Sequence, residues 1–92
     1  APASRALRAR ITGRVQGVSF RAWTASEAER LGLTGWVRNM PDGSGSALLC
    51  GPAPEVDQML EALHRGPPFA RVSAVTTQPA TESPPTGFTI RP

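Results

Sequence analysis

The chain has 92 residues, which is enough for one small domain. All ten of its basic residues are arginine and none is lysine, which excludes Schiff-base chemistry and the lysine-containing loops that bind nucleotides. The formal net charge is only +3, so charge alone does not indicate a nucleic-acid-binding protein.

Residues 1–4 are expected to be a disordered tail. Residues 5–92 are expected to form a single domain. Apolar and polar residues alternate strictly over residues 7–15, which predicts a half-buried strand. The outward positions of this strand include three arginines, Arg8, Arg10 and Arg14. Such a row fits a solvated strand face or an RNA-binding stripe, and we favour the solvated face.

The middle of the chain is predicted to contain a helix over residues 22–31, a strand over 34–39, a turn over 40–43 and a strand over 47–50. Gly45 and Ser46 stand where an apolar residue would normally begin the last of these strands. We therefore expect this strand to begin late or to be locally loose.

A second helix is predicted from one apolar stripe, Val56, Met59, Leu60 and Leu63. It is expected to begin near Pro54 and to end before Gly66. A strand over 70–77, a proline-rich loop and a last strand over 86–91 follow. The order β-α-β-β-α-β-β favours an α+β fold with two helices on one face of a mostly antiparallel sheet.

The segment that follows the first strand places Arg21 where a helix begins, although a helix N-terminus carries a partial positive charge. The first carboxylate downstream is Glu27, so no acidic residue offsets this charge in the first turn. Gly17 permits a loop whose N–H groups, from Gln16 to Phe20, point inward as a nest. These features predict a pocket for a small anion such as phosphate, with an ordinary structural turn as the alternative.

Asn39 is the second candidate residue, since it closes a strand and opens a turn. Taken alone, it fits simple turn capping. His64 and Cys50 are far apart in the sequence, so neither a Cys–His pair nor a metal cluster is expected.

Two motifs together resemble those of the acylphosphatase family. They read G-x-V-Q-G-V-x-F-R over residues 13–21 and L-G-L-x-G-W-V-R-N-x-x-D-G over residues 31–43. Gly66-Pro67, A-x-V at 70–72 and F-x-I at 88–90 match later landmarks of the family. The resemblance covers residues 6–91, nearly the whole chain.

This resemblance implies a ferredoxin-like βαββαβ fold with an additional C-terminal strand. It implies hydrolysis of acyl phosphates to a carboxylate and inorganic phosphate, with Arg21 binding the phosphate and Asn39 positioning the attacking water. The phosphate-binding residues implied are Val15, Gln16, Gly17, Val18, Ser19, Phe20 and Arg21. No metal or other cofactor is expected, and a phosphate oxygen of the substrate is the candidate proton acceptor.

The alternative function is a ferredoxin-like module that binds an anion or RNA without turnover. The absence of tyrosine and the presence of only three phenylalanines argue against a base-stacking RNA surface. The single cysteine, the lack of a run of about 20 apolar residues and the lack of a signal peptide predict a cytoplasmic protein. We expect a stand-alone monomer with neither a membrane nor nucleic acid as a partner.

Overall fold

Five strands and two helices make up the part of the chain that the computed structural model describes, residues 4–17 and 19–91. In chain order they are β1 (Ser4–Arg14), α1 (Phe20–Arg30), β2 (Thr34–Asn39), β3 (Gly45–Pro52), α2 (Ala53–Arg65), β4 (Arg71–Pro79) and β5 (Phe88–Ile90). This order confirms the predicted β-α-β-β-α-β-β arrangement.

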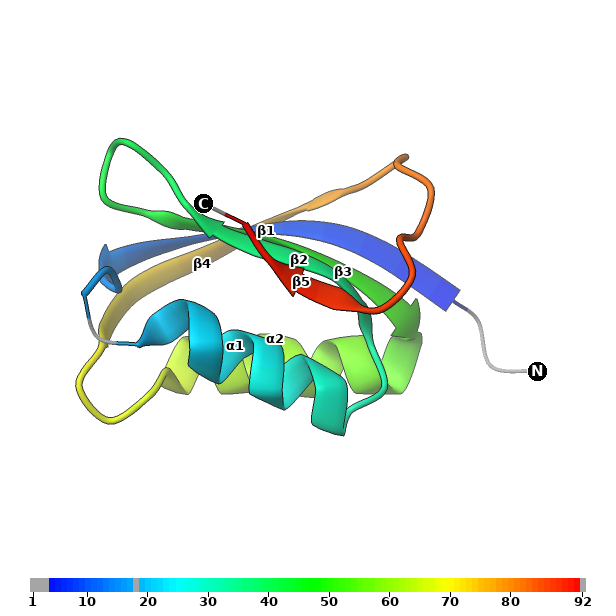
Figure 1. Ribbon diagram of the computed structural model, residues 1–92, viewed down its shortest axis with the longest axis horizontal. Helices are drawn as coiled ribbons and strands as arrows, with labels where there is room; N and C mark the ends of the chain where they lie inside the picture. The colour runs from blue at the N-terminus through cyan, green and yellow to red at the C-terminus, as the bar shows by residue number, and fades with distance from the viewer. Residues whose placement is uncertain (1–3, 18, 92) are drawn as a thin grey trace.

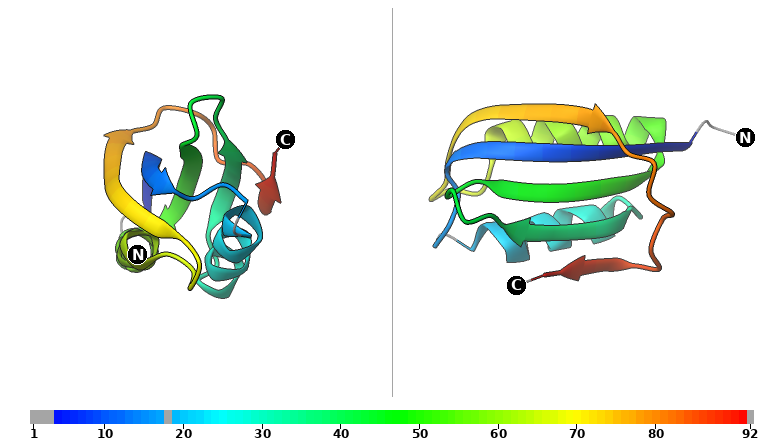
Figure 2. Two further views of the ribbon diagram at one scale, coloured as in Figure 1. Left: turned by 90° about the vertical axis from the view of Figure 1, so that its left-hand side faces the viewer. Right: turned by 90° about the horizontal axis from the view of Figure 1, so that it is seen from above.

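The strands form one sheet in the order β4-β1-β3-β2-β5 (Figure 2). β1 runs antiparallel to β3 and β4, and β2 runs antiparallel to β3 but parallel to β5. Consequently β1 and β2 are parallel to each other on either side of β3, and α1 connects them. α2 connects β3 to β4 around β1 in the same way, so two split βαβ units are interleaved.

Both helices cover the same face of the sheet (Figure 1). The alternation in β1 directs Leu7, Ala9 and Ile11 toward the helices, where all three are buried. Val56 and Met59 of the α2 stripe are completely buried against them. Two helices thus leave the opposite face of the sheet open.

Helix α1 begins at Phe20, two residues earlier than predicted. This start places Arg21 inside the first helical turn rather than before it. Ser4, which we expected in the tail, is the first residue of β1, and residues 1–3 lie outside the described part of the chain.

The expectation of a late or loose β3 is wrong. β3 begins at Gly45, which pairs with both Asn39 of β2 and Ile11 of β1, and its first six residues are buried. A Cβ atom at position 45 would lie 3.1 Å from Cε2 of the Phe20 ring. The glycine therefore makes room for an aromatic side chain of α1 rather than weakening the strand.

Close packing also explains Gly35, on the interior strand β2. Its φ is +141°, and a Cβ atom here would lie 1.8 Å from the carbonyl oxygen of Leu48. Only glycine fits this position without displacement of β3.

No helix among the residues described reaches the length and apolar character needed to cross a membrane.

Candidate active site

The loop between β1 and α1 turns through two residues with left-handed backbone, Gly17 with φ 75° and Ser19 with φ 59°. Ser19 is the N-cap of α1, yet its side chain makes no capping hydrogen bond. The N–H of Trp23 is the one that donates to the Ser19 carbonyl, at 3.0 Å. The preceding N–H groups of the first turn, from Phe20 on, have no carbonyl partner within the helix and are free to bind an anion.

A pocket of about 240 Å³ lies at this helix start. Its lining comes from the loop, the first turn of α1, the end of β2 and β5, and consists of Val15, Gly17, Ser19, Phe20, Arg21, Ala22, Asn39 and Ile90. Arg21 and Asn39, which are on separate elements, therefore share one cavity. Val18 lies outside the described residues, so the structure says nothing of its predicted role.

The Arg21 guanidinium is oriented by the main chain just beyond β5. Its Nη1 donates to the carbonyl oxygen of Arg91 at 3.0 Å, which leaves other N–H groups of the guanidinium for an anion. The first turn of α1 contains no acidic residue, and none of the salt bridges among the described residues includes Arg21. Its charge therefore adds to that of the helix N-terminus without compensation.

Asn39 is the last residue of β2, and alternation along the strand places it on the same face as the buried Val37. Its Oδ1 atom is buried and accepts no hydrogen bond from the described residues. A buried acceptor without a donor is rare and costs free energy.

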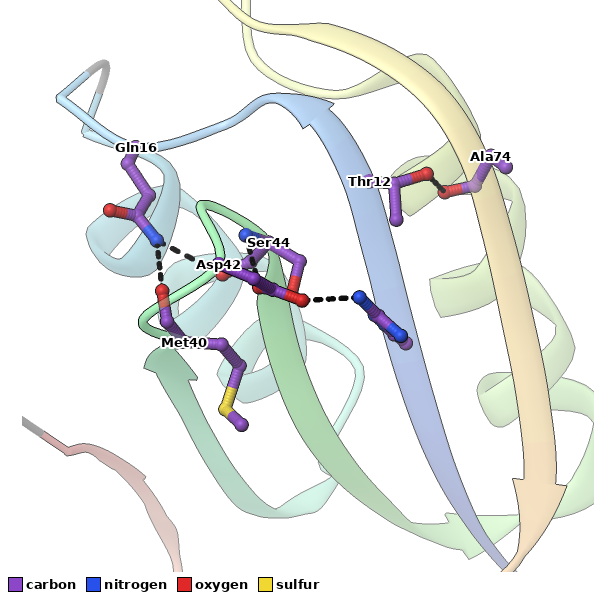
Figure 3. Close-up of polar contacts among 7 residues, drawn as sticks. Thr12, Gln16, Met40, Asp42, Ser44 and Ala74 are labelled. Carbon is purple, nitrogen blue, oxygen red and sulfur yellow. Dashed lines mark hydrogen bonds and ion pairs between the residues drawn. The ribbon is translucent and has the colours of Figure 1, made fainter.

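The Gln16 side chain points away from the pocket. Its Nε2 donates to the carbonyl oxygens of Met40, at 2.7 Å, and Ser44, at 3.1 Å (Figure 3). It therefore ties the loop between β1 and α1 to the turn between β2 and β3, directly after Asn39. The sequence suggested only a backbone role for Gln16 and did not show this contact.

The same turn is closed by Asp42. Its Oδ1 accepts hydrogen bonds from the Ser44 hydroxyl, at 2.6 Å, and from the Ser44 N–H, at 2.9 Å. Its Oδ2 pairs with Arg10. These contacts, with the Ser44 hydroxyl contributing most, lower the pKa of Asp42 from its ordinary value of 3.8.

Sequence reasoning missed Ala22, Ile90 and the carbonyl of Arg91. The first two line the pocket, and the third orients Arg21. The F-x-I motif at 88–90 marked β5 as a landmark but did not show that β5 reaches the site. Within residues 4–17 and 19–91, no three His, Cys, Asp or Glu side chains are grouped so that they could hold a metal ion.

Comparison with known proteins identifies the family. The family model described as Acylphosphatase matches residues 7–90. This chain belongs to the acylphosphatase family. The acylphosphatase of Rhizobium meliloti is 55% identical over 87 residues, which are 94% of this chain and 92% of that protein. An acylphosphatase is a hydrolase that acts on acid anhydrides.

Solved acylphosphatases share the fold. The structure of an acylphosphatase from Coxiella burnetii has a TM-score of 0.91 and 34% identity, and the match covers 96% of this chain and 93% of that one. The acylphosphatase from Bacillus subtilis has a TM-score of 0.86 and 33% identity, with 94% and 97% covered. The acylphosphatase fold implied by the two sequence motifs is therefore confirmed.

Proposed function

We propose that the chain hydrolyses the carboxyl-phosphate bond of small acyl phosphates in the pocket shared by Arg21 and Asn39, without a metal ion. The products are a carboxylate and inorganic phosphate. The observation that carries the proposal is the convergence of an uncompensated guanidinium, an uncapped helix N-terminus and an amide with an unpartnered acceptor on one cavity.

The phosphate is bound by the loop and by the start of α1. Backbone N–H groups of the first turn donate to its oxygens, and the Arg21 guanidinium adds a charged fork. In a loose transition state, charge is spread over the transferring phosphoryl oxygens, so donors already held in place stabilise it most. The hydrogen bond from Arg21 to the Arg91 carbonyl supplies that fixed position.

Asn39 positions the attacking water. Its Oδ1 accepts a hydrogen bond from the water, which directs the water oxygen toward phosphorus opposite the leaving group. A bond forms between the water oxygen and phosphorus while the bond from phosphorus to the acyl oxygen breaks, and the carboxylate departs with the electron pair.

The proton of the water passes to a phosphate oxygen of the substrate. Among the described residues, the side chains that line the pocket include no His, Cys, Asp or Glu to take it. A carboxylate is a stable leaving group, so the reaction needs no strong general acid. Positioning and charge stabilisation are then the main contributions of the protein.

The test is a steady-state assay with benzoyl phosphate in the presence of EDTA, with inorganic phosphate as a competitive inhibitor. Arg21→Gln is expected to lower kcat/KM at least ~100-fold. Asn39→Ala is expected to lower kcat while the inhibition constant of phosphate changes much less. The matched control is Arg30→Gln at the other end of α1, whose partner is Glu27 on the surface.

Wild-type turnover in either site variant would refute the assigned roles. Complete loss of wild-type activity in EDTA, restored by a divalent ion, would refute the metal-free mechanism.

We further propose that the protein acts as a cytoplasmic monomer. All the groups used in the mechanism come from one chain. Cys50 is free and buried, and burial raises the pKa of its thiol, which suits a reducing compartment without requiring it. Size-exclusion chromatography with light scattering tests the oligomeric state.

A further inference from the structure

The open face of the sheet contains a second and larger cavity, a groove of about 480 Å³, which we call the open-face groove. Arg10, Ser46 and Arg38 of its lining lie in one cross-strand row, and Arg8 and Trp36 lie in the next row, on either side of Leu48. The side chains of the intervening residues, such as Ala9 and Val37, point to the helices instead. The groove and the active-site pocket therefore lie on opposite faces and have no lining residue in common.

The open-face groove has an excess of positive charge. Four arginines line it, Arg8, Arg10, Arg38 and Arg91. Glu82 pairs with Arg8 and Asp42 pairs with Arg10. No salt bridge within the described part of the chain involves Arg38 or Arg91, and Nε of Arg38 is buried without a hydrogen-bond acceptor.

Trp36 holds these two uncompensated guanidiniums in place. The Cζ atoms of Arg91 and Arg38 lie 4.7 Å and 5.5 Å from the centroid of its ring. A guanidinium that rests on an aromatic ring keeps its N–H groups at the edges available for a ligand. The Cζ atom of Arg8 also lies 5.7 Å from this centroid, so like charges gather around one ring, and a bound anion would reduce their repulsion.

The same geometry indicates which ligand is recognised. The Trp36 side chain is only 4% exposed because the arginines cover it, so the ring is not a platform for stacking a nucleobase. Arginine forks suit phosphate oxygens particularly well. The groove has about twice the volume of the pocket proposed to hold one phosphate.

We propose that the open-face groove is a second anion-binding site, distinct from the active site, for a small molecule that carries two or more linked phosphate groups. Arg38 and Arg91 supply the uncompensated charge that attracts it. Arg8 and Arg10, which are held by exposed carboxylates, flank the site. The proposal does not depend on the hydrolytic function.

The experiment uses the Arg21→Gln variant, in which the active-site arginine is removed. Sodium pyrophosphate and sodium tripolyphosphate are titrated at constant ionic strength, and binding is followed by calorimetry. Saturable binding is expected. Removal of Arg38 and Arg91 together, each replaced by glutamine, should weaken it about tenfold or more. Arg65→Gln, an exposed change on α2 across the molecule, should leave it unchanged.

Trp36 offers a second, local measurement. The chain has two tryptophans, so Trp23→Phe in the same background leaves Trp36 as the only indole. Its fluorescence should change with the same dissociation constant as the calorimetric titration. Because Trp23 packs against Phe20, with ring centroids 6.1 Å apart, the calorimetry keeps the test valid if this variant is unstable.

Three results would overturn the proposal. They are no binding by Arg21→Gln, equal binding after loss of Arg38 and Arg91, and tighter binding of a short single-stranded RNA than of tripolyphosphate. The last would make the groove a nucleic-acid surface. None of these measurements uses acyl phosphate turnover, so their failure and the failure of the proposed hydrolysis are distinguishable.

Discussion

Replacing Gln16 with alanine should loosen the loop between β1 and α1 from the turn that follows Asn39. Two hydrogen bonds are lost, to the carbonyls of Met40 and Ser44, and each contributes about 0.5–1.5 kcal/mol. Neither carbonyl is left without a donor, because Gly43 N–H still reaches Met40 O at 3.1 Å and Met40 N–H still reaches Ser44 O at 2.8 Å. Alanine has no side-chain rotamers to order on folding, which offsets part of this loss.

These terms place the destabilisation at about 1–2 kcal/mol. A domain of this length loses roughly 4–8 °C in Tm for each kcal/mol. Thermal unfolding by circular dichroism should therefore show a clear fall in Tm for Gln16→Ala. Gln58→Ala, an exposed change on α2, should stay within about 0.5 kcal/mol of the wild type.

Activity should fall as well, because the loop and Asn39 must keep a fixed separation. A displacement of about 1 Å can reduce a rate ~100-fold, so a drop of about tenfold in kcat/KM is expected from partial loosening. Gln16→Glu keeps the length of the side chain but has no N–H to donate, and it should be at least as damaging. Unchanged Tm and kcat/KM in Gln16→Ala would refute the idea that this side chain connects the loop to the turn.

Two further predictions concern the sheet and its turn. Gly35→Ala should cost more than about 4 kcal/mol in urea unfolding, or prevent folding, because its Cβ would lie 1.8 Å from Leu48 O. Gly43→Ala, with φ 93° but nothing within 4 Å, should cost only about 1–2 kcal/mol, and equal losses would refute the steric argument. Because the folded state lowers the pKa of Asp42 below 3.8, its contribution to stability is present above that pH and is lost as the pH falls through the lower folded value. The Tm difference between wild type and Asp42→Asn should therefore shrink in acid, and Ser44→Ala should reduce it at neutral pH; a difference independent of pH would contradict this.

Local patterns in the sequence were sufficient for most of the fold. The alternation over residues 7–15 and the stripe from Val56 to Leu63 each state which face of an element is apolar. A single sheet with two helices on one face is the simplest way to bury the apolar face of the strand and that of the helix together. For the site, the placement of Arg21 at a helix start indicated an anion, whereas its pairing with Asn39 came from the family motifs.

The remaining features depend on contacts between residues distant in sequence. Gly45 suggested a loose strand because glycine weakens strands in general. The Phe20 ring that packs against it cannot be inferred from the local sequence. Arg8 and Arg10 are exposed, as expected of a solvated face, but the sequence did not show that they pair with Glu82 and Asp42 at the edge of a groove. Such contacts depend on how side chains from neighbouring strands and helices meet. The periodicity along one strand does not carry this information.

The carbonyl that orients Arg21 lies 70 residues further along the chain. During synthesis on the ribosome, the residues of the loop, both helices and four strands are therefore made before this acceptor. The nascent enzyme acquires its final guanidinium orientation only when β5 docks beside β2. Under the mechanism proposed above, competence for hydrolysis is tied to completion of the sheet edge rather than to formation of the first βαβ unit.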